Sequence, residues 1–177
     1  IIACHGESPR RMSKDAALLE AGPMEGNMET NLCANCFAGL TASGDKCPVC
    51  GWDNSTPQPP EALGCHTVVA SRYQVGRVKA QNGEGITYAA LDLTTQKLVE
   101  LREFFPTALA QRAEDGTAAP RSGKESLFDQ YLDDFIDLAK NVSRLREVTV
   151  VHSVLDIFEE NYTAYAVYEY VPSVTLG

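Results

Sequence analysis

The chain has 177 residues, of which 44% are hydrophobic and 22% charged, a composition typical of a globular protein rather than a disordered segment. Asp and Glu (24 residues) outnumber Lys and Arg (15 residues), and the resulting net charge of -9 disfavours nonspecific binding to nucleic acid or to an anionic membrane. The sequence has no apolar run of the roughly 20 residues that a membrane helix needs. It also opens without a signal-peptide pattern, so we expect a cytoplasmic, reducing setting.

The beginning and the end of the chain have few structural signals. Residues 1–30 carry mixed charge and few apolar side chains, which predicts a poorly ordered lead-in. The chain begins with Ile1 rather than Met and ends at Gly177 without a terminating pattern. We interpret it as a fragment of a longer protein, with Met24 and Met28 as candidates for a natural start.

Two C-x-x-C pairs follow in the sequence CANCFAGLTASGDKCPVCGW, which covers residues 33–52. Each pair can hold one side of a tetrahedral metal, because a tight turn after the first cysteine directs both sulfurs to one point. The candidate ligands are Cys33, Cys36, Cys47 and Cys50. Four thiolates without histidine are typical of a structural zinc site, so residues 31–53 predict a zinc ribbon that the metal stabilises. The alternative is a pair of disulfides, which a reducing compartment disfavours.

The main domain is predicted to occupy residues 71–177, after a polar, Pro-rich linker over residues 54–70. Apolar and polar residues alternate in RYQVGRV (72–78) and in GITYAALDL (85–93), which predicts two strands of a hairpin around a glycine-containing turn. KLVELREFF (97–105) predicts a third strand.

The second half of the domain predicts a loop, a helix and two more strands. Residues 107–125 have no periodicity and predict a long loop. A helix follows, because apolar residues then recur with the i, i+3, i+4, i+7 spacing of an amphipathic helix. They are Phe128, Tyr131, Leu132, Phe135, Ala139, Val142 and Leu145. HSVLDIFEE (152–160) and TAYAVYEYV (163–171) predict the final strands. The expected fold class is α+β, with a five-stranded antiparallel sheet and one helix packed on it.

Several of these stretches, in this order, resemble the small N-terminal lobe of a protein kinase. The resemblance is closest to bacterial serine/threonine kinases that carry a zinc ribbon ahead of the kinase domain. It covers about residues 33–177 and rests on CPVCGW, RYQVGRV, GITY, LREFFP, the helix, and FEENYTAYAVYEY. It implies that residues 71–177 form a kinase-like small lobe, and that a large C-terminal lobe would follow Gly177.

The resemblance also identifies departures in the phosphate-binding loop between the first two strands. The first two glycine positions of that loop fall on Ala80 and Asn82, whereas Gly83 and Gly85 are present. Side chains at the first two positions crowd the backbone that must lie over the phosphates of a nucleotide.

Three further departures lie in the third strand and the helix. Arg102 replaces the lysine that holds the α- and β-phosphates, Glu100 replaces the alanine above the adenine, and Leu138 replaces the helix glutamate. Arginine keeps the positive charge but is longer and forked, so it is not equivalent to lysine at such a site. The hinge that follows the last strand would place Glu169 and Val171 beside the nucleotide.

These departures favour a pseudokinase small lobe that acts as a binding or regulatory module with impaired ATP–Mg binding. The H-R-D and D-F-G sequence motifs of the catalytic lobe do not occur in the chain, so we assign it no catalytic residue. One alternative is the N-terminal part of a divergent active serine/threonine kinase, in which Arg102 is the cation and Asp134 or Asp137 replaces the missing glutamate. Another alternative is an unrelated zinc-ribbon adaptor whose sheet only imitates the lobe. The missing C-terminal lobe is the expected partner.

The resemblance also leads to an expectation about the cleft. Because a buried unpaired charge is costly, Arg102 should pair with Glu100, two residues back on the same strand face, or remain in solvent. Leu138 should pack between the helix and the sheet. Protein side chains should then fill the space that adenine and phosphates would occupy.

Overall fold

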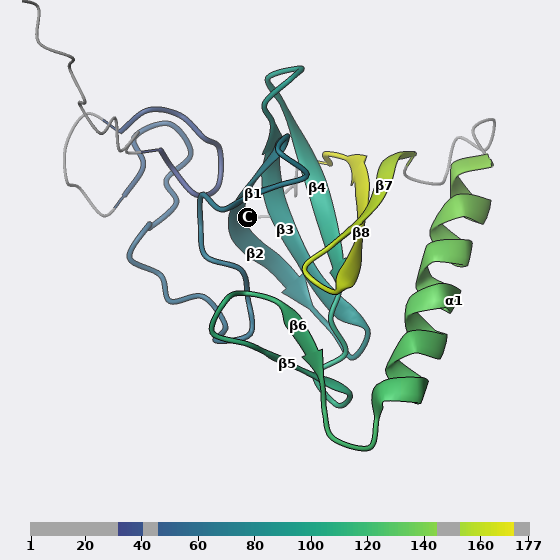
Figure 1. Cartoon of the computed structure of the whole chain (residues 1–177). Coiled ribbons are helices and arrows are strands. Elements are labelled where there is room, and N and C mark those ends of the chain that lie inside the picture. The colour runs from purple at the N-terminus through teal and green to yellow at the C-terminus, as the bar shows by residue number, and fades with distance from the viewer. Residues whose placement is uncertain (1–31, 41–45, 145–152, 172–177) are drawn as a thin grey trace, which may run out of the picture.

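The computed structural model describes residues 32–40, 46–144 and 153–171 (Figure 1). The predicted lead-in over residues 1–30 lies outside this part of the chain. The elements, in order, are β1 (Val68–Val69), β2 (Tyr73–Gln81), β3 (Gly85–Asp92), β4 (Lys97–Phe104), β5 (Ala110–Arg112), β6 (Ala118–Pro120), α1 (Glu125–Arg144), β7 (Val154–Glu160) and β8 (Thr163–Glu169). In the described part, no helix is long and apolar enough to cross a membrane.

The main sheet is antiparallel and has the strand order β1-β2-β3-β4-β8-β7. The expected fold class of an antiparallel sheet with one packed helix is confirmed. The sheet has six strands rather than five, because Val68 and Val69 pair with Gln74 and Tyr73 at the edge of β2. A two-residue strand is too short to show the alternation from which strands are predicted.

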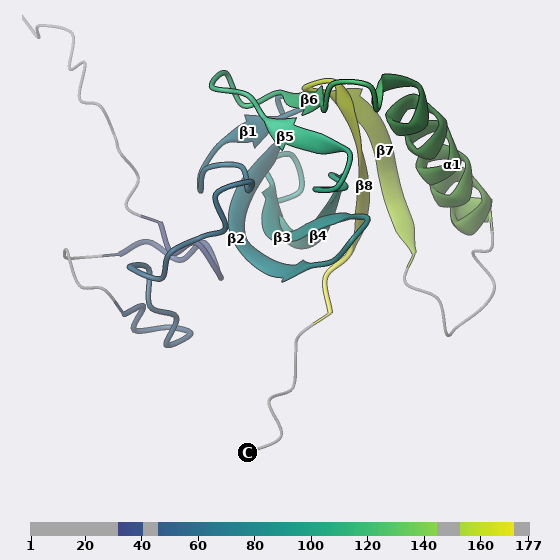
Figure 2. The same ribbon diagram turned by 90° about the horizontal axis from the view of Figure 1, so that it is seen from below.

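The main sheet is strongly curled (Figure 2), and buried apolar residues of its strands form one core. Successive residues of β4 point to opposite faces of the sheet, so that Val99, Leu101 and Glu103 are buried in the core while Glu100 and Arg102 face the other way. The largest fully buried side chains of this core include Tyr73, Tyr88, Tyr165, Ile86 and Leu101.

Residues 107–125, predicted as a loop, contain the two-stranded sheet of β5 and β6, which lies across one end of the curled sheet (Figure 2). Ala110 and Ala118 belong to the same buried core. The turn between these strands uses Gly116 with a φ of 85°. Strands of three residues have no readable periodicity, and the alanines that pack here carry a weak hydrophobic signal.

Helix α1 packs its apolar stripe against the sheet beside β7 and β8 (Figure 1). The Phe104 ring of β4 lies 5.3 Å from the ring of Phe128 and 5.5 Å from that of Phe135, measured between centroids. Leu138, which we expected to pack in this layer, is 64% exposed. This expectation is wrong because Ala139 and Phe135, one and three residues away on the helix, form the packed face and leave Leu138 on its margin.

The segment predicted as a linker, residues 54–70, is packed against the sheet. Leu63 is buried in the core, and its N–H donates a hydrogen bond of 3.1 Å to the hydroxyl of Tyr88. The N–H of His66 donates to the carbonyl of Val75 at 2.6 Å. A Pro-rich composition indicates a stiff backbone but does not reveal whether that backbone is packed.

Candidate metal centre and nucleotide-type cleft

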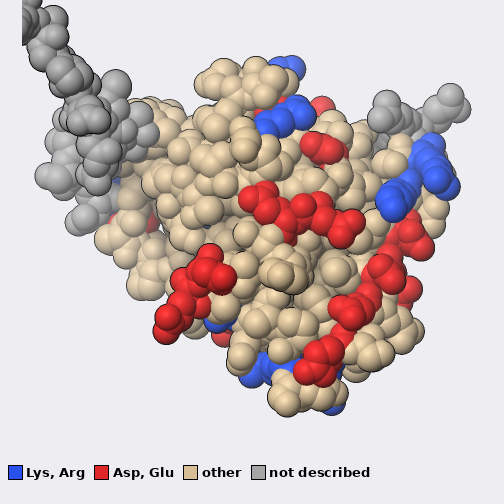
Figure 3. All heavy atoms as spheres, viewed as in Figure 1, with Lys and Arg blue, Asp and Glu red and all other residues tan. Residues whose placement is uncertain are grey.

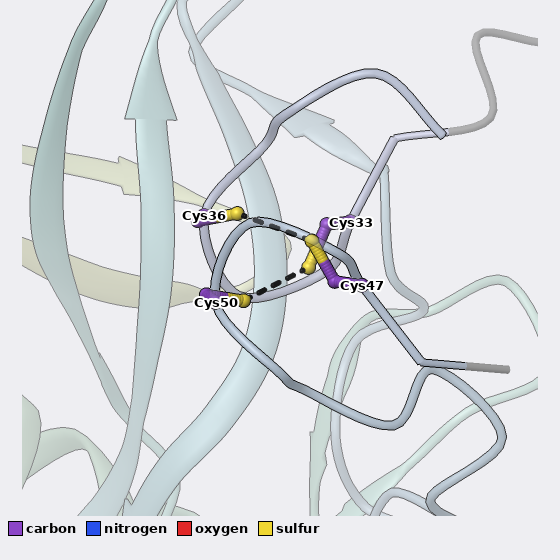
Figure 4. A group of neighbouring side chains, drawn as sticks. All are labelled: Cys33, Cys36, Cys47 and Cys50. Atoms are coloured by element: carbon purple, nitrogen blue, oxygen red, sulfur yellow. Dashed lines mark hydrogen bonds between the residues drawn. The ribbon is translucent and has the colours of Figure 1, made fainter. Parts of the chain in front are cut away.

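The four predicted cysteine ligands lie together, with their sulfurs pointing to one centre (Figure 4). The sulfurs of Cys33 and Cys50 are 3.6 Å apart, those of Cys36 and Cys47 are 3.7 Å apart, and all four lie within 4.8 Å of one another. A tetrahedral zinc ion with Zn–S distances of about 2.3 Å requires sulfurs about 3.8 Å apart. The set can therefore bind a metal such as zinc.

The two C-x-x-C turns that carry these sulfurs, which we call knuckles, have the same local structure. The N–H of Phe37 donates to the carbonyl of Cys33 at 2.9 Å, and the N–H of Gly51 donates to that of Cys47 at 2.8 Å. Phe37 and Gly51 have φ values of 57° and 73°. The N–H of Asn35 points to the sulfur of Cys33 at 3.4 Å. Each knuckle thus turns its chain so that both cysteines of a pair face inward.

The protonation of these thiols depends on their surroundings. Burial raises the pKa of Cys33, and it raises the pKa of Cys36 to about 12. Burial also acts to raise the pKa of Cys50, but hydrogen bonds from Asn35 and from the backbone of Trp52 lower it to about 7. Metal binding has to displace protons from these thiols, so affinity for the metal falls as the solution becomes more acidic.

The cysteine ribbon docks directly on β2. The N–H of Arg77 donates to the carbonyl of Ala34 at 2.7 Å, its Nε donates to the Oδ1 of Asn35 at 2.6 Å, and its guanidinium lies 4.4 Å from the Trp52 ring centroid. A Cβ added to Gly76 would lie 2.2 Å from the carbonyl oxygen of Ala34. The close approach of the two backbones therefore requires glycine at this position.

The glycine turn between β2 and β3 is closed by its own asparagine. The side-chain Oδ1 of Asn82 accepts hydrogen bonds from the N–H groups of Glu84 and Gly85, both at 3.0 Å. A Cβ on Gly85 would lie 2.0 Å from the carbonyl oxygen of Glu103, so glycine is required there by the packing of β3 on β4. Gly83 has open space around its Cα.

Of the two arrangements we expected for Arg102, the pair with Glu100 does not form, and the Arg102 side chain is instead 31% exposed beside a solvent-accessible partner. The Nη2 of Arg102 is 2.6 Å from the Oε2 of Glu84 in the glycine turn. Glu100 instead forms an ion pair with Lys79, which reaches from β2 across β3. Arg102 bonds neither Asp134 nor any other residue of α1 in the described part of the chain.

The Lys79–Glu100 pair lies beside the end of β8. The Nζ of Lys79 is 3.3 Å from the carbonyl oxygen of Val171 and 4.5 Å from the Tyr170 ring centroid. Glu169 closes β8, where it pairs with Val99 of β4. Both predicted hinge residues, Glu169 and Val171, thus lie at this end of the sheet.

Sequence reasoning missed a buried ion pair behind the cleft. The Glu103 carboxylate, fully buried, accepts two bonds of 2.8 Å from the guanidinium of Arg112. It also accepts bonds from the hydroxyls of Tyr88 at 2.7 Å and Tyr165 at 3.1 Å. Burial, together with the negative charge of Glu103, raises the pKa of both tyrosines. The available signal was a glutamate at an inward position of a strand whose other inward residues are apolar.

Comparison with known proteins gives a structural relative. Neither a family profile nor a curated protein matches the sequence. Among solved structures, the chain is similar to one titled "PpkA-294 apo form", from the bacterial serine/threonine kinase PpkA, with 26% sequence identity and a TM-score of 0.59. The match covers 62% of this chain and 39% of that chain, so this chain spans about two fifths of its relative's length. The curled sheet with α1 has a fold like that of a kinase small lobe.

Proposed function

We propose that this chain contributes a pseudokinase-like small lobe that binds other proteins rather than presenting a nucleotide for phosphoryl transfer. The observation that carries the proposal is the Lys79–Glu100 ion pair, with Lys79 also held by the carbonyl of Val171 and the ring of Tyr170. Glu100 stands where the family resemblance expects the small side chain above the adenine. A bonded pair of long side chains there leaves little room for a base.

The groups that would bind phosphates are also engaged by the protein itself. The side-chain oxygen of Asn82 accepts hydrogen bonds from the N–H groups of Glu84 and Gly85, and the carboxylate of Glu84 forms an ion pair with the guanidinium of Arg102. A nucleotide would have to displace these partners and then accept the carboxylate of Glu84 as a close neighbour. Displacing hydrogen bonds already made and adding like-charge repulsion both weaken phosphate binding.

The test is a titration of the chain with ATP–Mg, in which binding is measured by isothermal calorimetry and by the shift in Tm on thermal unfolding. We expect neither a binding heat nor a shift in Tm at millimolar nucleotide. The double variant K79L/E100A removes the ion pair and is expected to gain adenosine binding, whereas K97L, at an exposed lysine of β4, should behave like the wild type. A Tm rise of several degrees with ATP–Mg in the wild-type chain, abolished in R102M, would overturn the proposal.

A divergent active kinase is the second candidate, and one observation favours it. Arg102 keeps the positive charge near the glycine turn, and its partner Glu84 has a side chain that is 74% exposed. A pair this accessible to water contributes little stability and can open for a ligand. This candidate predicts that the protein binds ATP–Mg with Arg102 as the cation, and that R102M removes that binding.

For the cysteine cluster we propose structural zinc and a cytoplasmic location. The four sulfurs form a closed set without a position for a substrate, which is typical of structural rather than catalytic zinc. A site of four thiolates suits a reducing compartment, which keeps cysteines from forming disulfides. The metal would hold together the loops through which Ala34, Asn35 and Trp52 contact β2.

A further inference from the structure

A cavity of about 420 Å³ lies between the glycine turn and α1, apart from the Lys79–Glu100 pair, so the expectation that protein side chains fill this space is wrong beside the glycine turn. Its apolar walls are formed by Phe104, Pro106, Leu109, Tyr131, Phe135 and Leu138. This volume is within the range of about 300–1,000 Å³ that is usual for ligand-binding pockets. We call this cavity the turn–helix groove.

One wall of the turn–helix groove is an apolar stripe on α1 that remains accessible to water. Tyr131, Phe135 and Leu138 follow the i, i+4, i+7 spacing and so lie on one side of the helix. Leu138 is 64% exposed and Tyr131 is 45% exposed, although both are large and apolar. The floor is held in place, because the Phe104 ring packs against the rings of Phe128 and Phe135. The groove is therefore preformed and still has apolar surface to bury.

The rim of the turn–helix groove is acidic. Glu84 and Asp134 line it, and Asp133 and Asp137 are exposed beside Asp134 on α1, while Glu84 shares its charge with Arg102, which lies outside the groove lining. No Lys or Arg is among the described residues that line the groove. Figure 3 shows Asp and Glu side chains in a row along α1.

This charge selects among the possible occupants. Nucleotide phosphates, nucleic acid and anionic lipid would all meet the carboxylates of Glu84 and Asp134. A second copy of this chain carries the same net charge of -9, so self-association through this face would bring like charges together. A positively charged segment with apolar side chains can both pack against the apolar wall and pair with carboxylates at the rim.

We propose that the turn–helix groove binds a short amphipathic segment of a partner protein. Its apolar side chains would cover Phe104, Tyr131 and Leu138, and its Lys or Arg side chains would pair with Asp134, because Glu84 is already paired with Arg102. Apolar burial supplies the affinity, and the carboxylates set the orientation and the rate of association. This inference rests on the proposed function of a protein-binding lobe, to which it adds the surface and the chemistry of the partner.

The experiment begins with a displayed library of random short peptides, selected on the whole chain. We expect the enriched peptides to combine large apolar residues with Lys or Arg. An enriched peptide is then synthesised, and its affinity is measured by fluorescence anisotropy. The variant L138S should weaken binding by at least about tenfold, because the apolar contact is removed. The matched control is L155S, since Leu155 is 53% exposed on β7 and does not line the groove.

A second pair of variants tests the charged rim. D134N should reduce both the affinity and its dependence on salt, whereas D129N, on the same helix but outside the groove, should leave both unchanged. Equal effects of L138S and L155S would overturn the proposal by showing that the peptide does not bind at the groove. Equal effects of D134N and D129N would overturn it by showing that the peptide binds to acidic surface in general. Enriched peptides that lack basic residues would overturn it as well.

The same samples separate this inference from the proposed function. Binding of ATP–Mg to the wild-type chain would contradict the proposed function, whatever the peptides do. Absence of both ATP–Mg binding and peptide selection would remove the groove proposal alone.

Discussion

Replacing Gly76 by alanine should separate the cysteine ribbon from the sheet. The added Cβ would lie 2.2 Å from the carbonyl oxygen of Ala34, 2.8 Å from the Cζ of Phe37 and 2.9 Å from the carbonyl oxygen of Ala89. Two of these atoms belong to backbone, one in the ribbon and one in β3, so a side-chain rotation cannot relieve the clash. The ribbon is the smaller body and is the one expected to move.

The interactions that hold the ribbon on β2 set the size of the effect. The backbone bond from Arg77 to Ala34 contributes about 0.5–1.5 kcal/mol, and the bond from the Arg77 guanidinium to Asn35, which involves a charged donor, about 1.5–3 kcal/mol. The interaction between the guanidinium and Trp52 adds about 0.5–1 kcal/mol. Weakening the docking by about 2.5 kcal/mol or more shifts the balance between docked and undocked ribbon by well over tenfold.

The single tryptophan of the chain, Trp52, reports this change directly. In G76A we expect its fluorescence to become more accessible to a soluble quencher, while the circular dichroism of the sheet and the bound zinc are retained. The matched control is G39A, in the ribbon itself, because nothing lies within 4 Å of a Cβ added to Gly39. R77M should raise the accessibility of Trp52 without the backbone clash. Identical quenching and stability in G76A and G39A would refute this account of the interface.

Three further predictions concern the metal and the two best-formed ion pairs. Native mass spectrometry should find one zinc ion per chain. In C50S the zinc should be lost, and Trp52 should become more accessible to the soluble quencher. Finding both cysteine pairs oxidised in protein freshly purified under reducing conditions would contradict the prediction of a zinc site. R112M leaves the Glu103 carboxylate buried and unpaired and should cost about 3–5 kcal/mol of unfolding free energy in urea, whereas R102M, which breaks an accessible pair, should cost about 0–1 kcal/mol. The guanidinium of Arg72 lowers the pKa of Asp92, so the stabilisation is present above the unfolded pKa of about 3.9 and is lost as the pH falls below it. The difference in unfolding free energy between wild type and D92N should become smaller in acid. A difference that stays constant with pH would contradict a stabilising ion pair between Arg72 and Asp92.

Local sequence signals predicted much of the fold. Alternation located β2, β3 and β4, and the apolar stripe located α1, because these patterns depend only on the period of the element itself. The cysteine cluster was likewise predictable from spacing, since each C-x-x-C turn is a local structure. The packing of residues 54–70 was not predictable in this way, because the burial of Leu63 depends on Tyr88, which lies 25 positions later in the chain.

The pairing of charges shows why the candidate cleft was harder to predict than the fold. Residues i and i+2 on one strand share a face but lie roughly 6.5–7 Å apart along it, whereas directly opposed residues on neighbouring strands bring their Cβ atoms to about 4.5–5.5 Å. Considering one strand alone led us to expect that Arg102 would pair with Glu100 or remain in solvent. Across the sheet, Arg102 lies opposite Thr87, close to the turn that carries Glu84, and Glu100 is within reach of the long side chain of Lys79. The sheet thus provides each charge with a separate partner, and both partners come from the β2–β3 hairpin that would have to cover a nucleotide.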